Sequence, residues 1–411
     1  MNNTKGCFDM TTVKSNLNIA IIGGGIGGLS AAAFLNQAGH QVTVYEQAPE
    51  LGEVGAGLVV APNAVRLLRR IGALDKMQEK AVRLEAGWEF RRWSDGTVLS
   101  VENLDTRCAE LYGEDTYVLH RAELLAAIQS VVPADLLRLG SKLTSVRQDN
   151  DGVEFTLADG SVNRADILIG ADGVHSLVRE TIAEPGPAEY SGMCAFRSLV
   201  PAAKAPEFAK RPVQTLWIGP DHHLVHYPIS GGKFINLVAF APAGEFTRES
   251  WSSTTDLSEL LAEFAGWDPR LEELIKAAER PGRWALLDRA PLKKWTDGRI
   301  ALMGDAAHPM FPFFAQGAAQ SIEDAATLSA CLTRRPENPQ AALVTYESLR
   351  IERATKLQEM SHARKDINHL PDGPEQRERD ASLAQGDALV NAGWIYSYDP
   401  DVVVELEKVE A

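Results

Sequence analysis

A strand that runs into a glycine-rich turn and a helix constrains this chain more than any other feature. Residues 17–46 show the pattern of strand (LNIAII), glycine turn, helix (IGGLSAAAFLNQAG) and strand (QVTVYE). Gly23, Gly25 and Gly28 in the turn allow the backbone to approach a pyrophosphate closely, and a helix N-terminus stabilises its charge. Glu46 follows the second strand, where a carboxylate suits an unphosphorylated ribose. We expect a βαβ unit that binds FAD or NAD rather than NADP, with a plain tight turn as the alternative.

The composition is that of an ordinary enzyme-sized protein. With 411 residues, of which 45% are hydrophobic and 24% charged, the chain can build about two domains. The formal net charge of −15 disfavours a phosphate backbone as a ligand, and no block of five or six basic residues compensates for it. We therefore expect no nucleic-acid partner.

Four cysteines lie far apart in the sequence: Cys7, Cys108, Cys194 and Cys331. They form no CxxC motif and no His/Cys cluster at metal-binding spacing, so we expect neither a redox dithiol nor a metal site, in a reducing cytoplasm. Residues 19–35 are apolar, but five of the six residues from 23 to 28 are glycine, which weakens any helix that could span a membrane. We expect no membrane segment, no cleaved signal, and a flexible arm over residues 1–16.

Two later segments repeat the strand-to-turn pattern. Residues 170–179 read GADGVHSLVR after one apolar strand, and residues 304–309 read GDAAHP after another. With GGGIGG at 23–28, these ordered motifs resemble the single-component FAD-dependent aromatic hydroxylases, flavoprotein monooxygenases of the para-hydroxybenzoate, salicylate, 3-hydroxybenzoate and 6-hydroxynicotinate type. The likeness covers about residues 17–400. It implies that FAD is too long for one turn and binds with its AMP half at GGGIGG and its ribityl and isoalloxazine end at GDAAHP.

The same resemblance implies the remaining cofactor contacts. Asp305 would hold ribityl hydroxyls and the diphosphate, and a helix starting near Gln316 would direct its positive end at the flavin pyrimidine. Asp172 would bridge the flavin side and the nicotinamide nucleotide, and Arg121 would reach the FAD phosphates. The implied set is Arg121, Asp172, Gly304, Asp305, Pro309, Gly317 and Ala318. Simpler roles stay open, namely a helix cap for Asp305, a structural turn for Asp172 and a solvated side chain for Arg121.

The order of elements predicts an α/β fold. We expect a Rossmann-like FAD-binding domain of the para-hydroxybenzoate hydroxylase type, interrupted by a β-rich substrate domain and followed by a helical C-terminal tail. The expected boundaries are 1–16 for the flexible arm, 17–184 and 286–366 for the two parts of the FAD-binding domain, 185–285 for the substrate domain, and 367–411 for the tail.

The resemblance also implies the reaction. NADH or NADPH, with NADH favoured, reduces FAD, the flavin takes up O2 as a C4a-hydroperoxide, and the distal oxygen attacks an electron-rich ring. The protein must then exclude water and deprotonate a phenol. We expect a phenolic aromatic acid as the substrate, with decarboxylation where the carboxylate sits at the attacked carbon.

The segment HHLVHYPI holds the best candidates for the base. In a strand, His223 and Tyr227 share one face, about 13 Å apart at their backbones, while His222 and His226 share the other. The His-x-x-x-Tyr pair matches the one in the 3-hydroxybenzoate and 6-hydroxynicotinate hydroxylases. By that likeness His223 is the base or proton relay and Tyr227 contacts the substrate hydroxyl or carboxylate. Ordinary sheet packing, or a role for His222 or His226 instead, remains the alternative.

The pocket departs from those relatives toward apolar character. Val59 stands where the pyridine-specific enzymes carry a polar residue, and Phe313 lies in the sequence FPFF after GDAAHPM. Both disfavour a heterocycle with several polar groups. Because the expected ligands are anionic, local positive charge must exist, and Arg197, Arg121 and Lys233 are candidates that the sequence cannot rank.

Two other functions stay open. One is a flavin epoxidase, or a hydroxylase of a larger and non-acidic substrate, which the phenylalanine-rich segment favours. The other is a non-catalytic flavin-binding module. A monomer and a homodimer are both compatible with the sequence.

Overall fold

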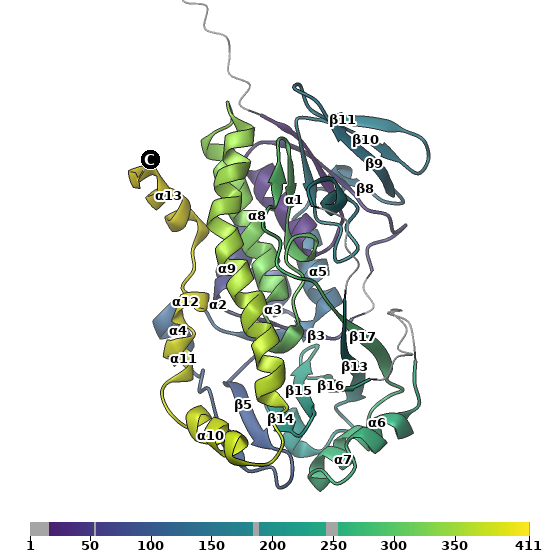
Figure 1. Cartoon of the computed structure of the whole chain (residues 1–411), viewed down its shortest axis with the longest axis vertical. Helices are drawn as coiled ribbons and strands as arrows, with labels where there is room; N and C mark the ends of the chain where they lie inside the picture. The colour runs from purple at the N-terminus through teal and green to yellow at the C-terminus, as the bar shows by residue number, and fades with distance from the viewer. Residues whose placement is uncertain (1–15, 53–54, 184–188, 244–253, 411) are drawn as a thin grey trace, which may run out of the picture.

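A computed structural model describes residues 16–52, 55–183, 189–243 and 254–410 of the chain. The expected flexible arm therefore lies almost entirely outside the described residues. Figure 1 shows two regions, an upper one with strands β8 to β11 and helices α1 and α8 and a lower one with strands β5 and β13 to β17, and the long helix α9 runs beside both. No helix among the described residues has the length and apolar character needed to cross a bilayer.

The upper sheet has six strands in the order β18-β19-β12-β1-β2-β8. All neighbours are parallel except the edge pair of β18 and β19. The strands are β1 (Asn18–Ile22), β2 (Gln41–Tyr45), β8 (Leu137–Arg138), β12 (Ile167–Gly170), β18 (Thr296–Asp297) and β19 (Ile300–Leu302). The residues of β12 and β19 are all buried, as expected of parallel strands covered on both faces.

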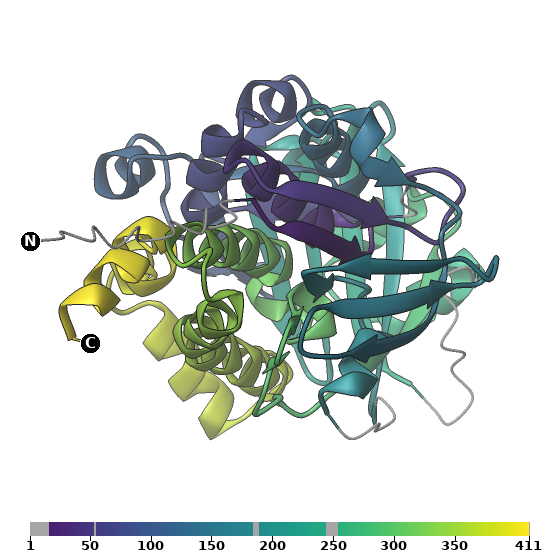
Figure 2. The same ribbon diagram turned by 90° about the horizontal axis from the view of Figure 1, so that it is seen from above.

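Helices cover one face of this sheet and a hairpin layer covers the other. The helices are α1 (Ile26–Gln37), α5 (Arg121–Gln129), α8 (Gly317–Arg334) and α9 (Pro339–Asn368). The second layer is the sheet of β9 (Leu143–Gln148), β10 (Val153–Leu157) and β11 (Val162–Ala165), whose Phe155 meets the ring of Tyr45 at 5.0 Å. Seen from above in Figure 2, the green helices α8 and α9 lie side by side, away from the blue strands β9 to β11.

Local sequence explains the βαβ opening. Four of the five residues of β1 are apolar, and α1 ends at Gln37, two residues before Gly39, whose φ of 88° is a left-handed conformation that glycine adopts without strain. Strands β10 and β11 form a hairpin, because Gly160 with φ of 85° occupies the turn between them. The Rossmann-like architecture expected from the glycine pattern is confirmed.

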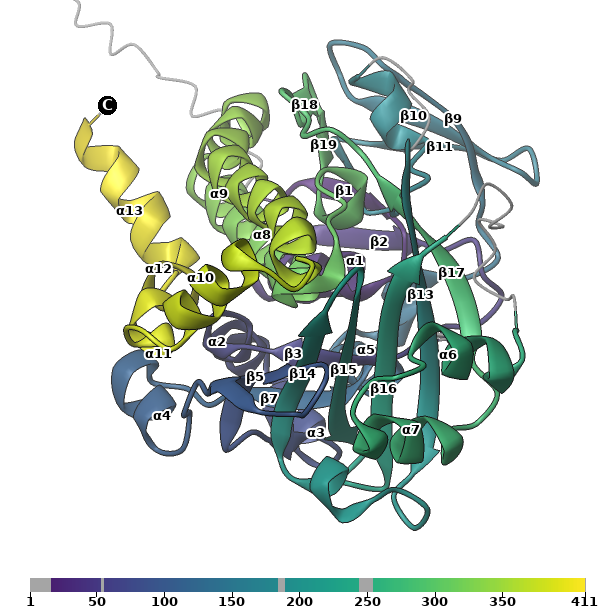
Figure 3. The same ribbon diagram turned by 60° about the horizontal axis from the view of Figure 1, so that its bottom comes forward.

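The lower sheet has seven strands in the order β17-β13-β16-β15-β14-β5-β6. They are β5 (Ala86–Arg92), β6 (Val98–Ser100), β13 (Glu189–Pro201), β14 (Val213–Gly219), β15 (His222–Ile229), β16 (Phe234–Pro242) and β17 (Gly282–Asp288). Two short helices, α6 (Leu257–Glu263) and α7 (Pro269–Lys276), cover its outer face (Figure 3). The inner face looks toward the FAD-binding region.

This sheet crosses the boundaries expected for the substrate domain. Strands β5 and β6 come from about 100 residues before the expected start at 185, and β17 runs to Asp288. Strand β5 pairs in parallel with β14. Parallel neighbours cannot be joined by a tight hairpin, so β14 finds its neighbour β5 in a distant part of the chain. Sequence periodicity identified neither the pairing nor its register.

Smaller elements connect the two sheets. A three-stranded sheet holds β3 (Gly57–Val60), β4 (Val82–Arg83) and β7 (Tyr117–His120), beside α2 (Pro62–Ile71), α3 (Leu74–Gln78) and α4 (Arg107–Tyr112). The tail is helical as expected, with α10 (Pro374–Leu383), α11 (Ala388–Asn391), α12 (Gly393–Tyr396) and α13 (Pro400–Glu410). Strand β15 belongs to the lower sheet and helix α9 packs on the upper one, yet the end of α9 reaches β15.

Candidate active site

The three turns expected from the sequence meet at one edge of the upper sheet. Strands β1, β12 and β19 are parallel neighbours, so their carboxyl ends lie side by side. The backbone N–H of Ala171 donates to the carbonyl of Ile22 at 2.8 Å, and the N–H of Met303 donates to the carbonyl of Gly170 at 3.0 Å. GGGIGG, GADGV and GDAAHP thus form one continuous rim, the geometry in which an elongated dinucleotide can contact both outer turns.

The three glycines of the first turn differ in whether a larger side chain would fit at their position. A Cβ added to Gly28 would lie 1.9 Å from the carbonyl oxygen of Gly23, and one added to Gly23 would lie 2.3 Å from the carbonyl oxygen of Ala171. A Cβ on Gly25 would meet nothing within 4 Å. The first two positions therefore require glycine for the fold itself, whereas Gly25 leaves open space where a ligand can approach the backbone.

Glu46 lies against the same turn. Its Oε2 accepts the backbone N–H of Gly24 at 2.7 Å, and its Oε1 accepts the N–H of Ala48 at 2.8 Å. The carboxylate is thus held at the carboxyl end of β2, next to the start of α1. This is the position that the sequence predicted for a ribose-binding acid.

The second outer turn carries an exposed acid on a buried frame. Gly304 is buried with φ of 57°, and the next residue, Asp305, is exposed. The carbonyl of Pro309 accepts a hydrogen bond from Nε2 of Gln358 on α9 at 2.9 Å, so this residue is oriented by the helix. Helix α8 starts at Gly317 and Ala318 with no acidic residue in its first turn and no side-chain cap. Its N-terminal N–H groups are the kind that bind anions or polarised carbonyls.

A buried ionic cluster that the sequence did not predict supports this turn from behind. Asp324 accepts the N–H of Gly304 at 2.9 Å and lies 2.6 Å from Nε2 of His308, whose side chain is directed inward and not toward the rim. Arg350 donates to Asp324 at 2.7 Å and to Glu323 at 2.6 Å, and all three side chains are fully buried. The adjacent acids Glu323 and Asp324, in a helix with no other charged residue before Arg334, were the only sequence signal for this cluster.

The middle turn is stabilised by its own aspartate. Oδ2 of Asp172 accepts the backbone N–H groups of Leu177 and Val178 at 2.8 and 3.2 Å, and burial raises the pKa of this carboxyl. Arg179, which ends the GADGVHSLVR motif, donates to the carbonyl of Val174 at 2.5 Å. In the structure Asp172 thus acts as a turn residue, while its place on the rim leaves a nucleotide contact open.

Arg121 starts α5, where its N–H donates to the carbonyl of Ala56 at 3.1 Å.

Strand β15 presents His223 and Tyr227 on its inner face, as the two-residue period predicted. His223 is 2% exposed, and its ring stacks on Phe240 at 4.3 Å and meets Phe313 edge-on at 5.0 Å. Burial, with positive charge nearby, holds the pKa of His223 well below its usual range. The ring is therefore neutral at physiological pH and able to accept a proton.

The other two histidines of the segment lie elsewhere. His226 accepts the indole N–H of Trp217 at 3.2 Å and packs against Phe208, within the outer core beneath α6 and α7. Burial lowers its pKa to about 3. His222 lies 2.9 Å from Oε2 of Glu263 on α6. Neither faces the inner side of the sheet.

Tyr227 lies at the opposite end of the inner face from His223. A Cβ on Gly57 would come within 2.7 Å of its ring and 2.8 Å of Asn236, whose Oδ1 accepts the N–H of Gly57 at 2.7 Å. Burial raises the pKa of Tyr227, and Arg197 on β13 opposes that shift. The phenol therefore stays protonated beside a guanidinium.

The structure distinguishes the three basic residues, Arg197, Arg121 and Lys233, that were candidates for binding an anionic ligand. Arg197 lies over the ring of Trp284 at 5.1 Å, and burial, with repulsion from Arg121, lowers its pKa to about 10, which leaves it charged at neutral pH. Lys233 is exposed in the turn between β15 and β16, away from the inner face. Arg197 thus lies near both Arg121 and Tyr227, whereas Lys233 faces solvent.

The inner face is otherwise apolar. Val59 packs in one cluster with Tyr227, and Phe313 packs in another with Phe240 and Phe311. The sequence missed Arg364 of α9, whose guanidinium lies 4.8 Å from the ring of Phe314 and 5.4 Å from that of Phe90. Within the described residues, no group of His, Cys, Asp or Glu side chains is arranged to hold a metal ion.

Comparisons with known proteins agree with this arrangement. Residues 16–361 match a family model described as FAD binding domain. The chain is 40% identical over 391 residues to 3-amino-4-hydroxybenzoate 2-monooxygenase PtmB3 of Streptomyces platensis, covering 95% of this chain and 98% of that protein. It is 37% identical to 6-hydroxynicotinate 3-monooxygenase of Bordetella bronchiseptica, covering 84% and 90%. A solved salicylate hydroxylase substrate complex matches with a TM-score of 0.80 and 27% identity, covering 96% of this chain and 98% of that one.

The fold, the rim of three turns and these relatives define an FAD-binding monooxygenase. The chain belongs to the FAD-binding-domain family, and within it to the FAD-dependent aromatic hydroxylases. The resemblance drawn from the three sequence motifs is confirmed, and a flavin-binding module without enzymatic activity is disfavoured.

Proposed function

We propose that this protein hydroxylates a phenolic aromatic acid with NADH and O2. One oxygen atom of O2 enters the ring and the other leaves as water, while NADH supplies the two electrons and a proton is consumed. Where the attacked carbon carries the carboxylate, CO2 leaves in place of the ring hydrogen and a second proton is consumed. The observation that carries the proposal is the neutral, buried His223 on the sheet face that looks toward the rim of three turns.

The residues of the rim fit FAD. The open space at Gly25 and the carboxylate of Glu46 suit the pyrophosphate and ribose of the AMP half. The exposed Asp305 suits the ribityl side, and the uncapped N-terminus of α8 at Gly317 and Ala318 suits the flavin pyrimidine. Bound there, FAD would supply hydride acceptance from NADH and the activation of O2. Arg121, Asp172, Gly304 and Pro309 complete the proposed cofactor site.

His223 is assigned the role of general base. Because Nδ1 of His223 is engaged by another ring, Nε2 is the nitrogen that can accept the substrate's phenolic proton. Removal of that proton increases the electron density of the ring, which favours attack by an electrophilic oxygen. A positioned general base of this kind contributes roughly 10²–10⁴ to a rate.

Tyr227 and Arg197 are assigned to the anionic end of the substrate. Tyr227 keeps its proton and can donate a hydrogen bond, and Arg197 keeps its charge in a buried position where a carboxylate would be stabilised. The relatives whose names specify hydroxybenzoate or hydroxynicotinate act on ring acids, which supports an acid here.

The apolar lining is assigned the task of excluding water. Phe240, Phe311, Phe313 and Val59 present no polar group that could hold water beside the reacting ring. A dry pocket limits the loss of reducing equivalents as hydrogen peroxide. NADH is favoured over NADPH because the strongly acidic protein opposes the extra phosphate charge.

The test is a screen of phenolic acids on the purified flavoprotein. NADH oxidation and hydrogen peroxide would be measured together for 3-amino-4-hydroxybenzoate, 3-hydroxybenzoate and salicylate, with benzoate as a control that lacks the phenol. A substrate is expected to accelerate NADH oxidation while peroxide stays well below the NADH consumed. Stimulation by none of the phenolic acids, or equal stimulation by benzoate, would contradict the proposal. Parallel assays with NADPH test the choice of reductant.

The phenylalanine cluster supports a second candidate. Phe311 and Phe313 share one cluster, and the rings of Trp88, Phe90 and Phe314 surround the guanidinium of Arg364, so aromatic side chains that a large apolar substrate could contact come from several elements. The second candidate function is therefore the hydroxylation or epoxidation of a larger, non-acidic substrate. The same screen distinguishes the two, because methyl esters of the phenolic acids should stimulate NADH oxidation at least as well as the acids only in this second case.

A further inference from the structure

His223 does not stand alone: its ring is joined to a second histidine from the far end of the chain. Nδ1 of His223 lies 2.6 Å from Nε2 of His369, and the ring centroids are 4.8 Å apart. At this distance one ring must donate a proton and the other accept it, since both are neutral imidazoles. Burial, with repulsion from His222, Lys365 and Arg379, lowers the pKa of His369 to about 3.

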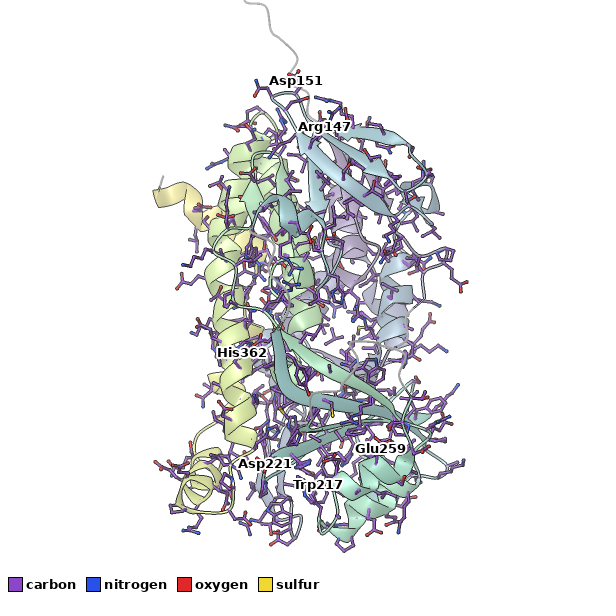
Figure 4. All side chains as sticks on the ribbon, turned by 45° about the vertical axis from the view of Figure 1, so that its right-hand side comes forward. Arg147, Asp151, Trp217, Asp221, Glu259 and His362 are labelled. Atoms are coloured by element: carbon purple, nitrogen blue, oxygen red, sulfur yellow. The ribbon has the colours of Figure 1, made fainter. Side chains whose placement is uncertain are left out.

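The position of His369 is fixed by its backbone. Its carbonyl accepts the N–H of Asp221 at 3.1 Å, in the turn that leads directly into β15. Arg379 of α10 donates to the carbonyl of Ile367 at 3.0 Å and so closes the end of α9. Figure 4 labels Asp221 at the lower end of the sheet, beside the C-terminal helices. The residue is thus held beside His223 by the sheet and by the tail together.

The two rings differ in exposure. His223 is buried among Phe240 and Phe313, whereas His369 is only partly buried, at the junction of α9 and the tail. A proton taken up by His223 would place a positive charge in an apolar site near Arg364. Lys365 and Arg379 add positive charge beside His369. On the other face of the strand, His222 acts on both rings and is itself paired with Glu263. Such a buried imidazolium is costly unless its charge can leave.

Deepening the proposed function, on which it rests, we propose that His369 is a positioning and relay residue that passes the substrate's phenolic proton from His223 to solvent. The phenol O–H bond breaks and its proton binds Nε2 of His223. The proton on Nδ1 of His223 moves to Nε2 of His369, and His369 releases one from Nδ1 to water. One proton leaves the substrate and one enters solvent, and no electrons are transferred. The tail therefore takes part in the chemistry of the pocket.

The test follows proton release on ligand binding to the oxidised holoenzyme, without turnover. Binding of 3-amino-4-hydroxybenzoate would be monitored by its phenolate absorbance, and proton release by a pH indicator in weak buffer, from pH 6 to 9. In His369→Gln we expect the FAD content and the ligand Kd at high pH to be retained. Proton release should slow by about tenfold or more, and the pH midpoint for phenolate formation should rise. His226→Gln, in the outer core against Trp217 and away from both rings, should behave as wild type.

A second variant separates chemistry from folding. In His369→Ala, added imidazole should restore fast proton release, because a free ring can occupy the vacated position, whereas a merely structural defect would not respond. Wild-type rates and an unshifted profile in His369→Gln, or no rescue of His369→Ala by imidazole, would overturn the relay. If wild type hydroxylates phenolic acids while His369→Gln matches it throughout, only the relay fails. If wild type responds to no phenolic acid, the proposed function fails first.

Discussion

The carboxylate of Asp324 lies 2.6 Å from Nε2 of His308 and joins the GDAAHP turn to the interior of α8. The same oxygen accepts the N–H of Gly304 at 2.9 Å, and the other oxygen accepts Arg350 from α9 at 2.7 Å. The pKa of Asp324 is held down to about 2, because the attraction of His308 and Arg350 outweighs the cost of burial. The turn proposed to hold the ribityl end of FAD is therefore fixed by a buried charge.

Asp324→Asn is expected to destabilise the fold and weaken FAD binding together. Removing the carboxylate from this buried ionic cluster leaves His308 without its acidic partner and Arg350 with Glu323 alone, at a cost of about 3 kcal/mol in the free energy of unfolding. Urea unfolding and FAD titration of the apoprotein measure the two effects. Asp401→Asn, which removes an exposed ion pair with Arg70, should change the free energy of unfolding by less than about 1 kcal/mol. Wild-type stability in Asp324→Asn would contradict the role given to the cluster.

Asp305→Ala is expected to weaken FAD binding without destabilising the apoprotein. The side chain is exposed, so its loss removes a contact to the cofactor and no buried interaction. We expect the Kd for FAD to rise at least about tenfold, equivalent to roughly 1.4 kcal/mol, with an unchanged unfolding transition of the apoprotein. Asp151→Ala, an exposed aspartate on the distant hairpin labelled in Figure 4, is the matched control. Full flavin retention by Asp305→Ala would place the ribityl contact elsewhere.

His223→Ala is expected to bind FAD normally while hydroxylation falls by at least about tenfold, because the phenol loses its base. Product formation per NADH, measured with hydrogen peroxide, should also fall. His226→Gln probes the alternative assignment, since that side chain lies in the outer core against Trp217. Hydroxylation that survives in His223→Ala but disappears in a folded His226→Gln would reverse the assignment.

Glu102 should make stability depend on pH. Its side chain is buried, and burial raises the pKa of the carboxyl to about 7, with the backbone of Trp88 opposing the shift. Because the folded protein binds this proton more tightly than the unfolded chain, the contribution is complete below the ordinary carboxyl pKa. It is lost as pH rises through about 7. Glu102→Gln should therefore raise the melting temperature at pH 8 and leave it nearly unchanged at pH 4.5. Equal effects of Glu102→Gln at both pH values would show that the carboxyl is not perturbed.

Much of the FAD-binding half was predictable because its signals are local. Glycine spacing, apolar strands and helix ends act over a few residues, and both the predicted βαβ opening and the predicted helix start near Gln316 appear. The predicted face of β15 also holds, since alternation along a strand depends only on its pleat. The place of β5 in the lower sheet was missed because a parallel pairing leaves no turn signal between the partners.

The sequence by itself determined the class of protein, through the resemblance that three ordered motifs carry, and the strand face that His223 and Tyr227 share, because alternation along a strand is short-range geometry. Only the tertiary structure decided that Asp324 supports the GDAAHP turn and that Arg197 is buried near Tyr227 while Lys233 is exposed. It alone joined His223 to His369, which is 146 residues away. Contacts of that kind arise when packing excludes water and forces distant polar groups to satisfy one another, and no periodicity along the chain records which ones will meet.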